Sequence, residues 1–130
     1  MAESVTLNKS KEFSIRIIKL YNFLCKEKME YVMSKQLLRC GTSIGANLAE
    51  AMYGISRKDF LSKVSISLKE CAETKYWLEL LNKTGYLNES EYTSINTDCT
   101  ELTKLLASTV KTTRQNDEKQ RANKESTSII

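Results

Sequence analysis

Three glutamates have the residue type and spacing that acid–base chemistry needs: Glu50, Glu70 and Glu73, on two neighbouring predicted helices. A pair such as Glu50 and Glu70 could pass protons as an acid and a base. The same carboxylates could instead form hydrogen bonds and ion pairs that fix helix register or subunit contacts. The chain has no histidine, which excludes His-based triads, H-E-x-x-H zinc sites and Glu-x-x-His di-iron sites. We favour the structural interpretation, and we predict no catalytic residue and a protein that is not an enzyme.

Small and polar side chains gather in the second predicted helix. Ser43, Asn47 and Glu50 are spaced four and three residues apart, which places them on one helical face. Gly41 and Gly45 each cost a helix about 1 kcal/mol relative to alanine, so we expect close packing against another helix to compensate. The stretch between these glycines lacks the lysine and the preceding strand of a phosphate-binding loop. We predict a structural or oligomer-forming polar seam made of Gly41, Ser43, Gly45, Asn47, Glu50, Glu70, Glu73 and Trp77.

Tyr76 and Trp77 are adjacent aromatic residues in the third predicted helix. Neighbouring side chains on a helix point about 100° apart, so at least one of the two rings should leave the core. Such a ring could anchor a subunit contact or stack on a base, or it could simply pack at the edge of the core.

Four cysteines, Cys25, Cys40, Cys71 and Cys99, could in principle form two disulfides or one zinc site. They lie far apart in sequence without a C-x-x-C pair, and each falls on or near an apolar helical stripe. We therefore expect buried free thiols, no metal site and no cofactor.

Positive charge is concentrated in the first half of the chain. The formal net charge is +4, and residues 1–60 carry ten Lys and Arg against six Asp and Glu. Cations outside the apolar stripes could be solvated, or they could meet the phosphates of RNA or DNA. The candidates for nucleic-acid binding are Arg16, Lys19, Lys26, Lys28, Lys35, Arg39, Arg57 and Lys58.

Hydrophobic spacing of three and four residues recurs in four segments, and the chain contains no proline. The first segment covers about residues 9–28, with Asn8 or Ser10 as its cap, and the second runs from about 31–34 to Gly54. Ser56 with Asp59 should cap a third helix that ends at Gly85. The fourth should start at a capping box formed by residues 88 and 91. The connections are short, so consecutive helices should be antiparallel.

These elements predict an all-α fold, an antiparallel up-down-up-down four-helix bundle that occupies residues 1–114. Residues 115–130 are polar and without hydrophobic periodicity, and we expect them to form a disordered tail. The start of the chain has no apolar segment typical of a secretory signal, and no window approaches eighteen consecutive apolar residues. We therefore expect a cytoplasmic protein with no membrane partner.

The stretches QLLRCGTSIGANLAEA at 36–51 and SRKDFLSKVSISLKECAETKYWLELL at 56–81 resemble a family of four-helix bundles. This family is named after proteins encoded in intervening sequences of 23S rRNA genes. The resemblance covers about residues 9–113, and Cys40 and Gly41 replace the alanine or serine of many relatives. It rests on Arg39, Ser43, Ile44, Asn47, Ala49, Glu50, Asp59, Phe60, Leu68, Glu70, Glu73 and Leu80.

The resemblance implies a ring-forming homo-oligomer, typically a homopentamer. It also brings in a second relative, the accessory variability determinant of diversity-generating retroelements, a basic pentamer that acts beside a reverse transcriptase on nucleic acid. The family has no established activity, so no catalytic residue is implied. The leading hypothesis is a non-catalytic oligomeric protein associated with RNA or DNA through its basic surface. The alternative is a protein-binding scaffold or accessory subunit that does not touch nucleic acid.

Overall fold

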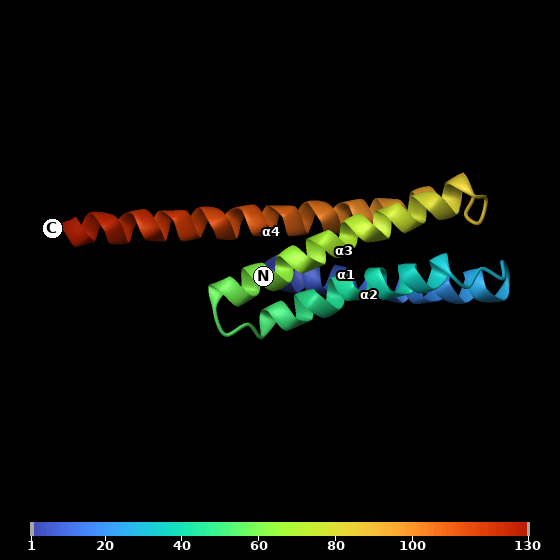
Figure 1. Ribbon diagram of the computed structural model, residues 1–130, viewed down its shortest axis with the longest axis horizontal. Helices are drawn as coiled ribbons and strands as arrows, with labels where there is room; N and C mark the ends of the chain where they lie inside the picture. The colour runs from blue at the N-terminus through green and yellow to red at the C-terminus, as the bar shows by residue number, and fades with distance from the viewer. Residues whose placement is uncertain (1, 130) are drawn as a thin grey trace.

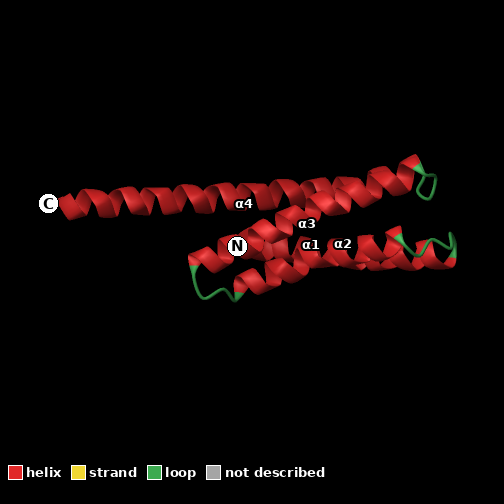
Figure 2. Cartoon of the chain, viewed as in Figure 1, coloured by secondary structure: helices red, strands yellow, loops and turns green. Residues whose placement is uncertain are grey.

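The computed structural model describes residues 2–129, with side chains described for residues 5–125. Four helices account for most of these residues, and short loops join them (Figure 1, Figure 2). The helices are α1 (Ala2–Lys26), α2 (Met33–Met52), α3 (Arg57–Lys83) and α4 (Glu89–Ile129).

Consecutive helices run antiparallel, so the α1–α2 and α3–α4 loops share one end of the molecule and the α2–α3 loop lies at the other (Figure 1). Each helix contacts the next, and α4 closes the bundle against α1, although α1 and α4 pack less closely than the other neighbours. The prediction of an all-α up-down four-helix bundle is therefore confirmed.

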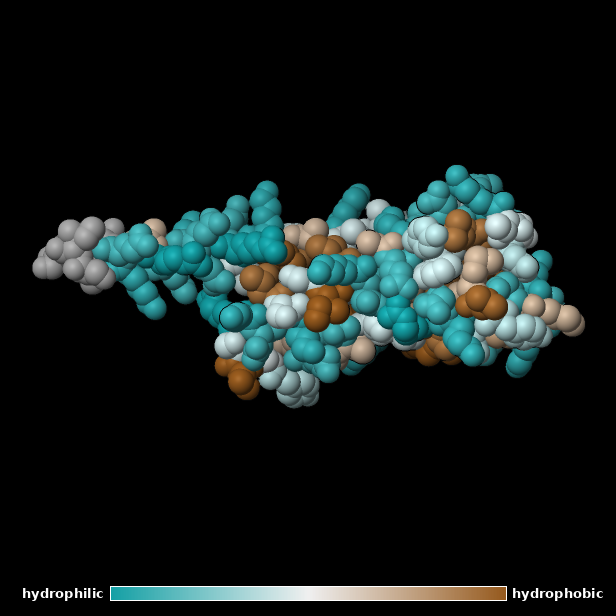
Figure 3. Space-filling view, viewed as in Figure 1, coloured by the Kyte–Doolittle hydropathy of each residue, from teal (hydrophilic) through white to brown (hydrophobic). Residues whose placement is uncertain are grey.

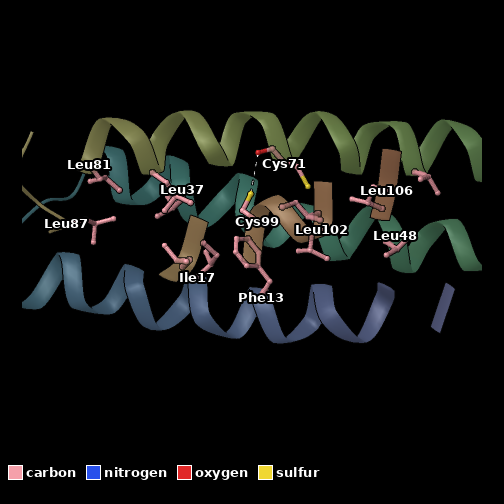
Figure 4. Packing of buried hydrophobic residues seen from close by; sticks show 14 of the residues in the cluster. Phe13, Ile17, Leu37, Leu48, Cys71, Leu81, Leu87, Cys99, Leu102 and Leu106 are labelled. Carbon is pink, nitrogen blue, oxygen red and sulfur yellow. Dashed lines mark hydrogen bonds between the residues drawn. The ribbon is translucent and has the colours of Figure 1, made fainter. Parts of the chain in front are cut away.

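The core is a continuous apolar column along the bundle axis. All four helices contribute side chains that are almost completely buried, and burying each large one stabilises the fold by about 1.5–3 kcal/mol. Figure 4 shows several of them pointing into the space between the helices. They include Phe13, Ile17, Leu37, Leu48, Leu78, Leu81, Leu102 and Leu106.

Local signals fix three of the helix ends, as the sequence predicts. Asp59 donates its backbone N–H to the Ser56 side chain at 3.1 Å, which caps α3. Asn88 and Glu91 exchange side-chain and backbone hydrogen bonds of 2.8 and 2.9 Å, a complete capping box before α4. Gly85 follows α3 with φ of +86°, a conformation that glycine adopts without strain.

The predicted start of the first helix is wrong. Helix α1 begins at Ala2, so Asn8 and Ser10 lie inside it and cannot be its caps. Ser10 is buried and donates its hydroxyl to the Leu7 carbonyl at 2.6 Å. Its small side chain faces α2, and its hydroxyl bonds to a carbonyl of its own helix. Serine can make such a bond inside a helix as well as at an N-cap.

Helix α4 continues to Ile129, within the segment 115–130 for which we expected a disordered tail; residue 130 lies outside the described residues. It is 41 residues long, so it spans about 60 Å and extends past the α2–α3 loop (Figure 1). The segment lacks an apolar stripe, but it also lacks proline and glycine and is rich in good helix formers. Arg57 of α3 forms a 2.9 Å ion pair with Asp117, which ties the start of this extension to the bundle. The boundary at residue 114 stays a prediction.

Glu30 caps α2 from the preceding loop, a role that the sequence did not suggest. Its carboxylate is buried and accepts backbone N–H groups from Val32, Met33 and Ser34 at 3.0, 3.1 and 2.7 Å. The Ser34 hydroxyl donates in return to the Glu30 carbonyl at 2.8 Å. Burial alone would raise the pKa of Glu30, but these backbone donors outweigh it and hold the pKa below its ordinary value.

We expect Glu30→Gln to lower the free energy of unfolding at neutral pH by about 1 kcal/mol, the usual worth of an N-cap. A lowered folded-state pKa contributes stability above the unfolded pKa of about 4.3, and this is lost as pH falls through the folded value. The difference between wild type and variant should therefore shrink as pH falls from about 6 to about 3. Urea unfolding at several pH values measures it. Glu27→Gln, which alters an exposed carboxylate in the same loop, should change little, and an equal effect of both variants would contradict this role.

Candidate nucleic-acid interface

The glycines of the polar seam serve packing within one chain. A Cβ atom at Gly41 would lie 2.8 Å from Cγ1 and 2.9 Å from Cγ2 of Ile17 on α1. At Gly45 it would lie 3.1 Å from the Ser10 hydroxyl. Glycine thus lets α2 approach α1 closely, and this contact compensates for the helix propensity that the two glycines lose.

The charged members of the polar seam form a network between α2 and α3. Arg39 reaches Glu70 at 3.3 Å and also forms a short ion pair with Glu73. The Trp77 indole N–H donates to the same Glu73 carboxylate at 3.1 Å. The hydrogen bond from Arg39, assisted by that from Trp77, holds the pKa of Glu73 below its ordinary value. Glu73 is therefore an ionised acceptor in a structural network.

The remaining polar side chains of the polar seam bond locally. Ser43 donates to the Arg39 carbonyl at 2.6 Å and Asn47 to the Ser43 carbonyl at 2.8 Å, both within α2. Glu50 pairs with Lys63 of α3 at 3.3 Å. Glu50 and Glu70 thus belong to separate ion pairs, and the structure does not bring them together as an acid–base pair.

The two adjacent aromatic rings differ in burial, as their spacing predicts. Trp77 is half-buried against the core and meets Tyr76 edge-on, with ring centroids 5.1 Å apart. Tyr76 is exposed, so it is the ring that leaves the core.

All three arginines among the predicted nucleic-acid ligands are engaged within the chain. Arg16 of α1 contacts Asp98 of α4 at 2.6 Å and the Ser94 hydroxyl at 3.0 Å. Arg39 pairs with the two α3 glutamates, and Arg57 pairs with Asp117. These arginines join helices, and their charges are partly neutralised by partners that lie far away in the sequence.

The five lysines among the predicted ligands differ from the arginines. Their side chains are exposed, and none has an ion pair with another described residue. Lys19 and Lys26 are seven residues apart and lie on one face of α1, Lys28 follows in the loop, and Lys35 lies in the first turn of α2. We call Lys19, Lys26, Lys28 and Lys35 the α1–α2 lysines. Lys58 lies near the opposite end of the bundle, at the start of α3.

Three apolar residues that the sequence pattern did not identify accompany these lysines. Met29, Tyr31 and Val32 of the α1–α2 loop are 73%, 58% and 74% exposed. At the right-hand end of Figure 3, where this loop lies, hydrophobic atoms are interspersed among hydrophilic ones. Helix periodicity does not reveal their exposure, so the only available signal was that apolar residues lie between two predicted helices.

The cysteines are free, as expected, although Cys25 is only partly buried. Burial raises the pKa of the Cys40 thiol to about 11, so this thiol is not a nucleophile at neutral pH. Across the described residues, no three side chains of His, Cys, Asp or Glu gather in a way that could hold a metal ion. The expected absence of metals and cofactors stays a prediction.

The 23S rRNA-intervening sequence protein family matches residues 3–108. The chain belongs to this family. A solved structure from Bacteroides thetaiotaomicron VPI-5482, described as a protein with unknown function from the S23 ribosomal protein family, is similar to most of this chain. The two chains are 55% identical with a TM-score of 0.84, and the match covers 85% of this chain and 99% of the other. None of the curated proteins compared with the chain matches it.

The 23S rRNA-intervening sequence family assignment confirms the resemblance drawn from residues 36–81. The matched region ends at residue 108, whereas α4 continues to Ile129. In the part of the chain that the structure describes, no helix is both long and apolar enough to cross a membrane.

Proposed function

We propose that this member of the 23S rRNA-intervening sequence family is a non-catalytic oligomeric protein that associates with RNA or DNA in the cytoplasm. The observation that carries the proposal is the contrast between its cations: the arginines join helices, whereas the α1–α2 lysines are exposed without an ion pair to another described residue. Lysines in this condition can replace the counterions of a phosphate backbone. The family name adds support, because it refers to an RNA gene.

The same geometry favours binding over catalysis. The carboxylates best suited to acid–base chemistry, Glu50, Glu70 and Glu73, are each paired with a cation. A general acid or base near neutral pH needs a pKa raised toward the working pH, and Glu73 is shifted the other way. Lysine side chains contact phosphates as point charges, so we expect little preference among base sequences.

A mobility-shift series with structured RNA, duplex DNA and single-stranded DNA at two salt concentrations tests this proposal. We expect retardation of all three at low salt and a steep loss of affinity at the higher salt. If none is retarded at low salt, the result favours the alternative function, a protein-binding scaffold. Such a scaffold could use exposed apolar side chains such as Tyr53 and Ile55, which are 88% and 95% exposed.

We also propose that the protein assembles as a ring-forming homo-oligomer, a homopentamer. Ile15 and Ile18 are exposed on the outer face of α1, and Ile66 and Tyr76 are exposed on α3. Covering such side chains would remove apolar area from water, and closed rings do this with one repeated contact. Light scattering should then give about 75 kDa, five times the 14.9 kDa chain. A particle of one chain mass at micromolar concentration would refute assembly.

A further inference from the structure

The α1–α2 loop is held in one conformation by hydrogen bonds to both helices that it joins. The Glu30 backbone N–H donates to the Leu24 carbonyl at 3.0 Å, which folds the loop back on the end of α1. The Glu30 carboxylate binds three successive backbone N–H groups at the start of α2. Both sides of the loop are therefore fixed to a helix.

Met29 has a φ of +53°, the left-handed region that a bulky side chain rarely adopts. A conformation of this kind costs free energy and persists only where the surroundings impose it. Here it accompanies three apolar side chains, Met29, Tyr31 and Val32, that are more than half exposed instead of packed on the core. The loop thus adopts a backbone conformation that costs free energy and leaves apolar side chains in water. This combination is typical of a recognition element.

Charge complementarity limits what can bind this loop. Lys26, Lys28 and Lys35 flank it, and the Lys28 ammonium lies 5.8 Å from the centroid of the Phe23 ring, which helps to position it. The Glu30 carboxylate is buried, and its oxygens are occupied by backbone N–H groups at the start of α2. An exposed aromatic ring among lysines is the combination that binds an unpaired nucleotide, with the base on the ring and the phosphates near the ammonium groups.

A lipid bilayer fits the loop less well. The exposed carboxylate of Glu27 is only two residues before Met29 in the chain, so insertion of this loop into acyl chains would bring a charged carboxylate toward them. Moving a charged carboxylate out of water is costly.

We infer that the α1–α2 loop is a stacking site for unpaired nucleotides, with Tyr31 as the platform and Lys26, Lys28 and Lys35 as the phosphate contacts. This inference rests on the proposed function and specifies its ligand as single-stranded nucleic acid. Duplex binding uses only the lysines, because bases stacked within a duplex do not present their faces to a side chain.

The test compares the full chain with Tyr31→Leu and Tyr31→Phe in fluorescence anisotropy, using labelled oligo(U) RNA and an RNA duplex of equal length. Stacking of one base predicts that Tyr31→Leu weakens oligo(U) binding by about tenfold and leaves duplex binding unchanged. Tyr31→Phe keeps the ring and should bind oligo(U) like wild type. Tyr53→Leu removes another exposed tyrosine, in the loop at the opposite end, and should have no effect on either RNA.

The outcomes separate the inference from the proposed function. If wild type binds RNA but Tyr31→Leu binds oligo(U) equally well, or loses both RNAs equally, the stacking site is refuted and the proposed function stands. If wild type binds neither RNA at low salt, both are refuted. Binding to vesicles of phosphatidylcholine and phosphatidylserine that Tyr31→Leu abolishes, with oligo(U) binding intact, would make the loop a membrane contact and also overturn the inference. Thermal unfolding followed by circular dichroism establishes that each variant is folded.

Discussion

Gly41→Leu should lower the free energy of unfolding by about 3 kcal/mol or more, and it should reduce the yield of folded protein. A Cβ atom alone would come within 2.9 Å of both Cγ atoms of Ile17. These atoms branch directly from the Ile17 Cβ, and the side chain is completely buried in the core, so it cannot swing away. The helices would have to separate, and overpacking of this kind typically costs about 1–3 kcal/mol before the larger leucine is accommodated.

Ala46→Leu is the matched control for Gly41→Leu, because it adds a leucine to an exposed position on the same helix. Its effect on stability should be within about 0.5 kcal/mol of zero. Gly45→Leu should lower the free energy of unfolding by an amount between those of Gly41→Leu and Ala46→Leu, since the nearest atom to its added Cβ is the Ser10 hydroxyl oxygen at 3.1 Å. Urea unfolding of the three variants gives the order. Equal stability of Gly41→Leu and Ala46→Leu would show that α1 and α2 are not closely packed at Gly41.

The parts of the fold that were predictable depend on contacts close in sequence. The caps at Ser56 and Asn88 join residues three positions apart, and Gly85 needs only its own backbone conformation. The predicted start of α1 was wrong because Ser10 has the residue type of an N-cap. In the structure its small side chain instead allows α1 to lie close to Gly45 of α2. The α4 extension was missed because hydrophobic periodicity cannot detect a polar helix.

The candidate site was predicted only in part, for a related reason. The sequence identifies which cations lie outside the apolar stripes, but it does not identify their partners. Arg16 pairs with Asp98, which is 82 residues further along the chain, and Arg39 pairs with Glu73, which is 34 residues further along. Only the three-dimensional arrangement separates these structural arginines from the exposed lysines. The Glu30 cap was missed because glutamate is not among the preferred N-cap residues and acts here from two positions before the cap.

Neutralising Lys26, Lys28 and Lys35 together by glutamine should weaken binding to every nucleic acid by about thirtyfold or more near physiological salt. Each lost phosphate contact removes one release of counterions, so the affinity and its salt dependence fall together. Arg16 is left intact, because its loss would disturb the α1–α4 contact through Asp98 and Ser94 and confuse the result. Lys69, Lys104 and Lys111, which lie exposed on α3 and α4, give a triple glutamine control with the same change in net charge.

The slope of log affinity against log salt concentration for these two triple variants and wild type tests the proposed function most directly. Loss of three phosphate contacts predicts that the slope for the Lys26, Lys28 and Lys35 variant flattens by about two to three per protomer. The control variant should keep the wild-type slope, and both variants should keep the wild-type helicity and particle size. Equal slopes for all three proteins, or equal flattening in both variants, would contradict the assignment of nucleic-acid binding to Lys26, Lys28 and Lys35.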